Sequence, residues 1–325
     1  MPSASSVVLR HLGYVDLSQH EASGGFDHAA VHAASGNVYV AHTANNAVDV
    51  LDPSCRSYLF SVRHLPGVAG VLVSDEAQII ITANRGENTI GIFSPAPEPK
   101  VSKIAVGVRP NVLAYDHARR QILVANVGDP TLPGSHTLTI VGLLERAVRA
   151  EIPVAGRTRW TVYDPDAQAF YVNLADPSEI VVVDARQPNR IARTFAIPSA
   201  GPHGLDLDLT THRLFCACDS GMLITLDAQS GKVLGQDPLS GAPDVCFSIA
   251  CTDASTSPLA TPASSTYSIR KQWRSSRVSQ PKRERTLSRS PLPATRSTRF
   301  HPRSTGRQSI RPFTSEHCAN LRPTA

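Results

Sequence analysis

A segment that recurs every 42 to 48 residues constrains the fold of this chain more than any other feature. Each copy contains a β-branched strand with a large apolar residue, then a polar turn and a further strand. The large apolar residues are Tyr39, Ile81, Leu123, Tyr171 and Phe215, which stand 42, 42, 48 and 44 residues apart. Repeats of this length are typical of propeller blades and of solenoid turns.

Each repeat predicts three to four short strands. The second strands lie in the blocks VYVAHT, IIITAN, ILVAN, FYVNL and LFCAC, and the third strands are predicted at 47–52, 89–94, 137–142, 179–184 and 222–227. Short strands rich in Val, Ile, Thr and Tyr, bounded by Gly, Pro, Asn and Asp, predict an all-β chain. We therefore predict a β-propeller of four-stranded antiparallel blades. A turn insertion at 129–135 explains the one long interval.

The blocks VYVAHTANNAVDVLD and IIITANRGENTIGIFS resemble the YVTN-type repeats of seven-bladed β-propellers, a group that includes lactonase-like and surface-layer-like propellers. The resemblance covers residues 24–245. It implies seven blades in an intact member, of which about five are intact here. Because such propellers include both binding proteins and lactonases, the resemblance implies the fold and leaves the activity open.

The repeat pattern ends near residue 246, and the composition changes with it. Residues 254–325 hold 14 of the 32 lysine and arginine residues but only two of the 27 acidic residues, Glu284 and Glu316. A segment dominated by Ser, Pro, Thr and Arg buries too little apolar surface to offset the entropy of ordering. We predict three regions. Residues 1–23 form an N-terminal segment whose strand at 7–18 completes the last blade. Residues 24–247 form a propeller with blades one to five and the start of blade six, and residues 248–325 form a disordered tail.

A shifted reading frame is another explanation of the tail. If GC-rich codons are chosen for 256–273 and each triplet starts one base earlier, the segment can read YVAVGDPGVIDVFDTEAM. This sequence has a Tyr-Val pair, a Gly-Asp-Pro turn and a strand that ends at Asp, as a sixth blade should. The same shift yields blade-like sequence further on. We therefore hypothesise a one-base slip near 246–249, which would make the positive charge of the tail an artefact.

A basic tail is also typical of an arm that binds nucleic acid or an anionic surface, since clustered arginine supplies affinity for phosphate. Stacking on bases would require aromatic residues among the arginines. Tyr267, Trp273, Phe300 and Phe313 are isolated instead. We therefore keep this function as a second alternative and do not expect nucleic acid as a partner.

The aligned first strands give the candidate site. The first strand of a propeller blade lines the central channel, so its leading residue stands at the channel mouth. The alignment places there His28, Ala69, Asn111, Arg159 or Trp160, His203 and Asp244. Convergent polar groups of this kind are what sites for small ligands require. We therefore predict a binding scaffold with a small molecule or a protein at this face. The alternative is that these residues cap strand ends and bind channel water.

A metal-assisted lactone hydrolase is the runner-up. Asn111 and Asp244 could supply oxygen ligands to a divalent cation, and His203 could act as a general base near neutral pH. The set contains no Glu, and the chain has no Gly-x-Ser-x-Gly nucleophile and no CxxCH haem motif. We therefore favour a protein that is not an enzyme, and we expect no cofactor other than such a cation.

Other chemistry-bearing residues are predicted to be structural. Cys216 and Cys218 share a strand face, and without a CxxC spacing or a nearby His pair they are interpreted as small buried hydrophobes. The segment 84–88 (Asn-Arg-Gly-Glu-Asn) is predicted to be a tight turn rather than a site. Four aspartates are expected to serve the turns that follow third strands, namely Asp49, Asp52, Asp184 and Asp227.

The N-terminal sequence MPSASSVVLRHLGYVDL has its only Arg after a very short apolar stretch, so it lacks the pattern of a secretory signal. No apolar run reaches the length of a membrane span. These observations predict a cytoplasmic protein, and they leave its oligomeric state open.

Overall fold

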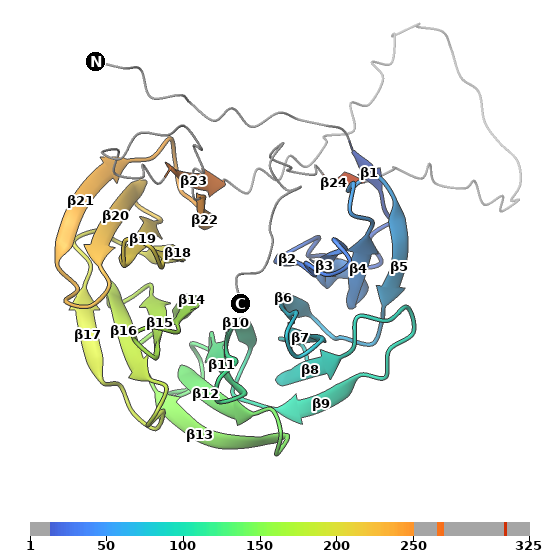
Figure 1. Ribbon diagram of the computed structural model, residues 1–325, viewed down its shortest axis with the longest axis horizontal. Helices are drawn as coiled ribbons and strands as arrows, with labels where there is room; N and C mark the ends of the chain where they lie inside the picture. Colours follow the sequence, from blue (N-terminus) through green and yellow to red (C-terminus); the bar gives the residue numbers. More distant parts are fainter. Residues whose placement is uncertain (1–13, 250–264, 270–308, 311–325) are drawn as a thin grey trace, which may run out of the picture.

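The computed structural model describes residues 14–249, 265–269 and 309–310. Within them, five antiparallel sheets of four strands each are arranged around a common centre (Figure 1). The strands of each sheet follow chain order from the centre outward. The fold is therefore a β-propeller with five four-stranded blades, which confirms the architecture predicted from the repeats.

Corresponding strands occupy the same position in every blade. The inner strands are β2 (Ala29–Val31), β6 (Val68–Ser74), β10 (Pro110–Asp116), β14 (Thr158–Asp164) and β18 (Pro202–Asp208). The second strands are β3 (Val38–His42), β7 (Ile79–Asn84), β11 (Gln121–Asn126), β15 (Ala169–Leu174) and β19 (Arg213–Cys218). The third strands are β4 (Ala47–Leu51), β8 (Thr89–Phe93), β12 (Thr137–Gly142), β16 (Glu179–Asp184) and β20 (Met222–Asp227). The outer strands are β5 (Tyr58–Val62), β9 (Ser102–Ala105), β13 (Ala147–Pro153), β17 (Arg193–Ala196) and β21 (Val233–Pro238).

Two short strand pairs occupy the part of the circle that the five blades leave (Figure 1). One joins β22 (Val245–Ile249) to β23 (Ser265–Ile269), and the other joins β1 (Val15–Asp16) to β24 (Ser309–Ile310). Apart from these strands, the predicted tail lies outside the described residues, as do positions 7–13 of the predicted N-terminal strand. The disordered tail, its basic arm and the closing strand at 7–18 therefore stay predictions.

The blades are held together by apolar layers between neighbouring sheets. Phe170 packs with Leu123 in the layer between the third and fourth blades, whereas Tyr171 packs with Leu205 in the layer between the fourth and fifth. Successive residues of a strand point to opposite faces, so a strand with a blade on each side is apolar almost throughout. Full burial of each such side chain contributes about 1.5–3 kcal/mol. The repeated Val-, Ile- and Leu-rich blocks follow from this two-sided burial.

Tight turns join the inner and second strands of each blade. The residue before the second strand takes a left-handed backbone in four blades, with φ of 51° at Gln78, 49° at Arg120, 52° at Gln168 and 51° at His212. In the first blade Gly36 adopts φ 72°. Four blades therefore share one turn conformation, and the left-handed backbone disfavours β-branched residues at its position.

Three of the four aspartates expected to serve turns do so. Asp52 accepts the backbone N–H groups of Arg56 and Ser57, and Asp184 and Asp227 accept N–H groups of the residues that follow them. Asp49 differs, because it lies inside β4, is fully buried and binds side chains of its own blade. The expectation that Asp49 serves a turn is therefore wrong.

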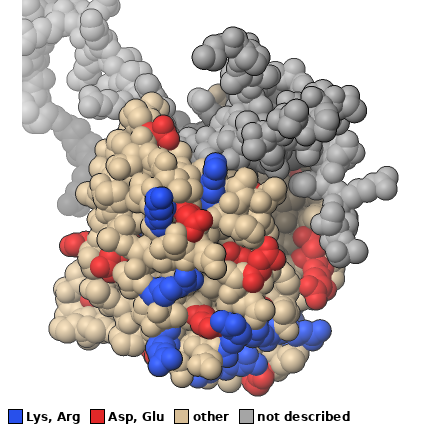
Figure 2. Space-filling view, turned by 60° about the vertical axis from the view of Figure 1, so that its left-hand side comes forward, with Lys and Arg blue, Asp and Glu red and all other residues tan. Residues whose placement is uncertain are grey.

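The outer surface of the blades carries both signs of charge side by side (Figure 2). Helix among the described residues is confined to η1 (Thr43–Asn45), and in this part of the chain no helix is long and apolar enough to cross a membrane.

Candidate functional site

A β-bulge interrupts the start of the inner strand in four blades. The extra residues are Ala69 in β6, Asn111 in β10, Arg159 and Trp160 in β14, and His203 in β18. They are the positions that the repeat alignment assigned to the channel mouth. A bulge disrupts the ladder locally and re-aims the side chain of its extra residue. The two other aligned residues, His28 and Asp244, directly precede β2 and β22.

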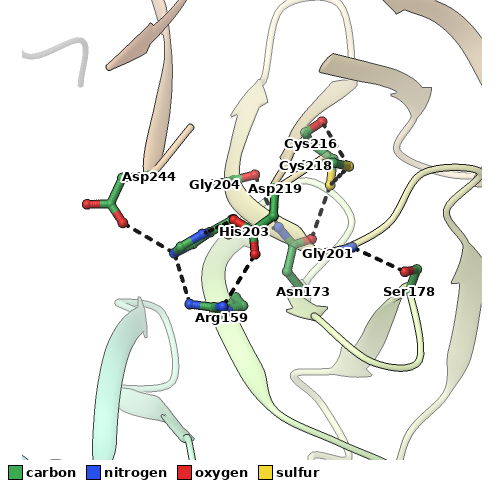
Figure 3. A network of polar contacts seen from close by, with 10 residues as sticks. All are labelled: Arg159, Asn173, Ser178, Gly201, His203, Gly204, Cys216, Cys218, Asp219 and Asp244. Carbon is green, nitrogen blue, oxygen red and sulfur yellow. Dashed lines mark hydrogen bonds and ion pairs between the residues drawn. The ribbon is translucent and has the colours of Figure 1, made fainter. Parts of the chain in front are cut away.

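His203 is the centre of a polar network at this mouth (Figure 3). Its Nδ1 lies 2.7 Å from Oδ1 of Asp219, and its Nε2 lies 3.2 Å from Nη1 of Arg159 and 3.3 Å from Oδ1 of Asp244. Asn173 of the neighbouring blade fixes the bulge, because its Nδ2 donates to the carbonyl oxygen of His203 at 3.0 Å. Three of the predicted site residues, Arg159, His203 and Asp244, therefore come together.

The two neighbours of His203 Nε2 require opposite hydrogen-bonding roles of this atom. The Arg159 guanidinium can only donate, so it binds Nε2 when the imidazole is neutral and Nδ1 carries the proton. The Asp244 carboxylate can only accept, so it binds Nε2 when the imidazole is protonated. The protonation state of His203 therefore selects which of these partners Nε2 binds.

A second group of contacts surrounds Arg85. Its Nη2 donates to Oδ1 of Asn111, and its Nη1 lies 3.3 Å from Oδ2 of Asp27. The other oxygen of Asp27 lies 3.4 Å from Nε2 of His28. Asn111 and His28 thus share a network with Arg85 and Asp27, two residues that the aligned first strands do not place at the mouth.

Trp160 and His28 form an aromatic contact at the channel. Their ring centroids are 4.5 Å apart and the ring planes are tilted by 59°. Both residues line a cavity of about 240 Å³ whose other walls are mostly aliphatic, including Val71 and Leu113. Polar groups at the mouth therefore adjoin a cavity whose lining side chains are mostly aliphatic.

The mouth concentrates positive charge in a partly buried setting. Burial is the largest cause of a lowered pKa for the Arg85 guanidinium, and Arg109 and Arg157 lower it further. Burial also lowers the pKa of Arg159, again with Arg157 and with Arg85 acting in the same direction. The carboxylate of Asp244 opposes both shifts. Arginine remains charged in proteins. The lowered pKa values therefore reflect mainly the burial of two charged groups, which Asp27 offsets in part at Arg85 and Asp219 at Arg159.

Arg85 and Asp219 share a register that the repeats could have revealed. Each stands four residues after its large apolar strand residue, Ile81 in one blade and Phe215 in the other. The segment 84–88 forms the predicted tight turn, since the N–H of Glu87 bonds to the carbonyl of Asn84 at 3.3 Å. The turn and the mouth contact coexist, and the local sequence predicts only the turn.

The two predicted metal ligands have different partners. Asn111 accepts a hydrogen bond from Arg85, while Asp244 faces His203. Within the described residues, no three His, Cys, Asp or Glu side chains gather as a metal site. Cys216 and Cys218 are buried free thiols with sulfur atoms 3.9 Å apart. Their prediction as small buried residues is confirmed, and the divalent cation stays a prediction.

The fold and this mouth define the chain as a member of the β-propeller class. No family model matches the chain, and no curated protein matches it. Among solved structures, it is similar to hydrazine synthase of Kuenenia stuttgartiensis with a TM-score of 0.51, over 68% of this chain and 89% of that chain. The two sequences are 9% identical, so this similarity shows the fold alone.

Proposed function

We propose that this chain is a non-enzymatic binding scaffold, a β-propeller of the YVTN type that takes a small ligand at its channel mouth. The observation that carries this proposal is the network centred on His203, which joins side chains from two blades and from the segment before β22. The adjoining cavity, with its mostly aliphatic lining side chains, supports it further, because ligand sites typically combine hydrophobic side chains with a few convergent polar groups.

Trp160 provides a direct test of this proposal. The chain contains two tryptophans, Trp160 at the mouth and Trp273 in the tail. A library of neutral, cationic and anionic fragments is screened by ligand-observed NMR, and each hit is titrated while tryptophan emission is recorded. We expect hits to change the emission of the unmodified chain and of Trp273→Phe, and to leave Trp160→Phe without a response. The scaffold proposal fails if no fragment binds, or if all hits leave Trp160 unaffected.

A hydrolase with His203 as general base is the second candidate. The 2.7 Å contact between His203 and Asp219 favours it, since a carboxylate on Nδ1 orients an imidazole for proton abstraction at Nε2. A panel of lactones, assayed with and without added divalent cations, separates the two functions. Turnover by the unmodified chain that His203→Ala abolishes would replace the scaffold by the hydrolase. We expect no turnover in either chain.

We also propose that the intact protein has seven blades and that the tail is read in a shifted frame. The support is the repeat period, which the shifted frame continues beyond Phe215. DNA sequencing across codons 244–250 tests this directly. We expect a one-base difference that restores the blade pattern, and a clean frame would refute the hypothesis.

A further inference from the structure

Arginines from neighbouring blades place their charges near the guanidinium groups of Arg85 and Arg159 at the channel mouth. Arg85 follows β7, Arg109 and Arg157 precede β10 and β14, and Arg159 lies in the bulge of β14. Their charges lower the pKa of Arg85 or of Arg159, as described above. Like charges repel at short range, so arginines that lie near one another at the mouth favour the binding of a negative charge there.

The aspartates at the mouth form only long ion pairs with these arginines. Asp27 lies 3.3 Å from Nη1 of Arg85, and Asp219 lies 3.4 Å from Nη2 of Arg159. Charge-assisted bonds between guanidinium and carboxylate groups are typically 2.7–2.9 Å long. On the outside of the fourth blade, Arg186 and Asp184 form such a pair with two bonds of 2.9 and 2.7 Å. The ion pairs at the mouth are therefore looser than a pair elsewhere in the same chain.

The guanidinium groups also keep unused donors. Among the residues that the structure describes, the Nε atoms of Arg85 and Arg159 are buried and have no hydrogen-bond partner. The terminal nitrogens of Arg85 face Asn111 and Asp27, and those of Arg159 face His203 and Asp219. A buried N–H without an acceptor costs free energy. Each terminal nitrogen carries two N–H groups, so an oxyanion at the mouth could accept from the remaining terminal N–H groups of a guanidinium, as carboxylates and phosphates do.

A purely structural role explains less of this arrangement. Arginines that only stabilised the blades would be expected to form closed pairs, as Arg186 does with Asp184. One partner of Arg159 is His203, whose affinity for a guanidinium is lost on protonation. Arg85 therefore has an amide and one loose carboxylate as partners, and Arg159 has an imidazole and one loose carboxylate, an arrangement that a better acceptor could replace.

The cavity next to the mouth indicates what accompanies the anion. It is lined by His28 and Trp160 at the aromatic contact and by aliphatic residues such as Val71, Leu72 and Val112. A volume of about 240 Å³ suits a ring or a short chain, and the aliphatic side chains in the lining favour contact with carbon over water. Inorganic phosphate or sulfate would leave this space unused.

We propose that the mouth binds a small organic carboxylate, whose anionic group lies between Arg85 and Arg159 and whose apolar body enters the cavity beside Trp160. This inference rests on the proposed binding function and names the chemical class of its ligand. Asp27, Asp219 and Asp244 would then position the arginines and His203 for the ligand.

Isothermal titration of the full chain with matched probes tests the inference. Benzoate is the carboxylate probe, benzamide is its neutral analogue, benzylamine is its cationic analogue, and inorganic phosphate is an anion without an apolar body. We expect benzoate to bind about tenfold or more tightly than each of the others, because only it satisfies both the arginines and the cavity. Rising chloride concentration should weaken benzoate binding to the unmodified chain.

Variants assign the binding to the arginines. Arg85→Gln and Arg159→Gln should each weaken benzoate binding by about tenfold or more, since each removes a charged donor pair. Arg186→Gln is the matched control on the outer surface, and its affinity should equal that of the unmodified chain. Circular dichroism and thermal melting establish that each variant is folded, and the chloride titration of the unmodified chain does not depend on any variant.

Several results would overturn the inference. Benzamide, benzylamine or phosphate could bind as tightly as benzoate. The folded Arg85→Gln and Arg159→Gln variants could bind benzoate as tightly as the unmodified chain does. Benzoate could also fail to bind at concentrations up to about 10 mM, which would detect even the weak affinity of a fragment. If neutral or cationic fragments bind beside Trp160 while benzoate does not, the result supports the scaffold function and contradicts the assignment of a carboxylate ligand. If no fragment of any charge binds there, both fail.

Discussion

Two His–Asp pairs in this propeller have the same hydrogen-bond length and different surroundings. In the first blade, His42 Nδ1 lies 2.7 Å from Asp49 Oδ2, and both side chains are fully buried. At the channel mouth, His203 Nδ1 lies 2.7 Å from Asp219 Oδ1, and 19% and 40% of these side chains are exposed. The length of a His–Asp contact therefore does not distinguish a buried structural pair from the pair at the mouth.

The difference lies in what surrounds each pair. The second oxygen of Asp49 accepts a 2.6 Å bond from Ser61, and His42 packs on the rings of Phe26 and His20. All of these partners belong to the first blade or to the segment before it. His203 instead faces a guanidinium and a carboxylate from other parts of the ring. We infer that the buried pair stabilises one blade, whereas the exposed pair serves ligand binding.

Removal of each carboxylate should separate the two roles most clearly. Asp49→Ala leaves the buried His42 and the part-buried Ser61 without this acceptor, and we expect a loss of about 3–5 kcal/mol in the free energy of unfolding. Asp219→Ala removes an exposed partner, so we expect a loss below about 1 kcal/mol. Urea denaturation followed by circular dichroism measures both. Equal losses would show that the two pairs do not differ as we infer.

Replacement of each histidine should give the converse result for binding. His203→Ala removes the group that holds Arg159 Nη1, so we expect benzoate affinity to fall about tenfold, equivalent to 1.4 kcal/mol. His42→Ala should destabilise the fold and leave the affinity of the folded fraction unchanged. Calorimetric titration at a temperature where both variants are folded makes the comparison. A binding loss in His42→Ala alone would reverse our assignment.

The sequence predicts the blades well because their energetics are local and repeated. Phe170 and Tyr171 are adjacent and each contacts a different neighbouring blade, so both had to be apolar. Because such strands are buried on both faces, every repeat contains a continuous hydrophobic block. The alignment of these blocks then locates the bulges, and with them Asn111 and His203.

The mouth is less predictable because its contacts join residues far apart in the chain. Arg85 meets Asn111 26 residues away, and Arg159 meets Asp219 60 residues away. The local sequence around Arg85 is that of a tight turn, and the turn does form. Only the position of the next blade brings the Arg85 side chain to Asn111. Asp49 was misassigned for a similar reason, because its partner His42 lies on the adjacent strand and is not part of a turn signal.

A smaller change tests whether the buried pair depends on its full set of partners. Ser61→Ala removes the donor to Asp49 Oδ1, and we expect a loss of about 1 kcal/mol in unfolding free energy. At the mouth, Asp244→Asn removes the 3.3 Å ion pair with His203 and should change stability by less than about 0.5 kcal/mol. Thermal melts at neutral pH compare them. A larger loss in Asp244→Asn would mean that the mouth, too, is mainly structural.

The smallest effect concerns pH and the first blade. Burial lowers the pKa of His20 from its usual value of 6.5, and the charge of His42 lowers it further, while Asp49 opposes the shift. Between the lowered pKa and 6.5, the unfolded chain binds more protons than the folded chain does. Stability should therefore fall as the pH drops through 6.5 and level off below the lowered pKa.

His20→Gln tests this linkage, because the variant lacks the titrating group and keeps a polar side chain of similar size. We expect the melting temperature of the unmodified chain to decrease from pH 8 towards pH 5 more steeply than that of His20→Gln, measured in matched buffers over about this range. His212→Gln, in an inner-to-second-strand turn of the fifth blade, is the control and should retain the full slope. If the melting temperatures of all three chains changed with pH in parallel, protonation of His20 would not account for the pH dependence of stability.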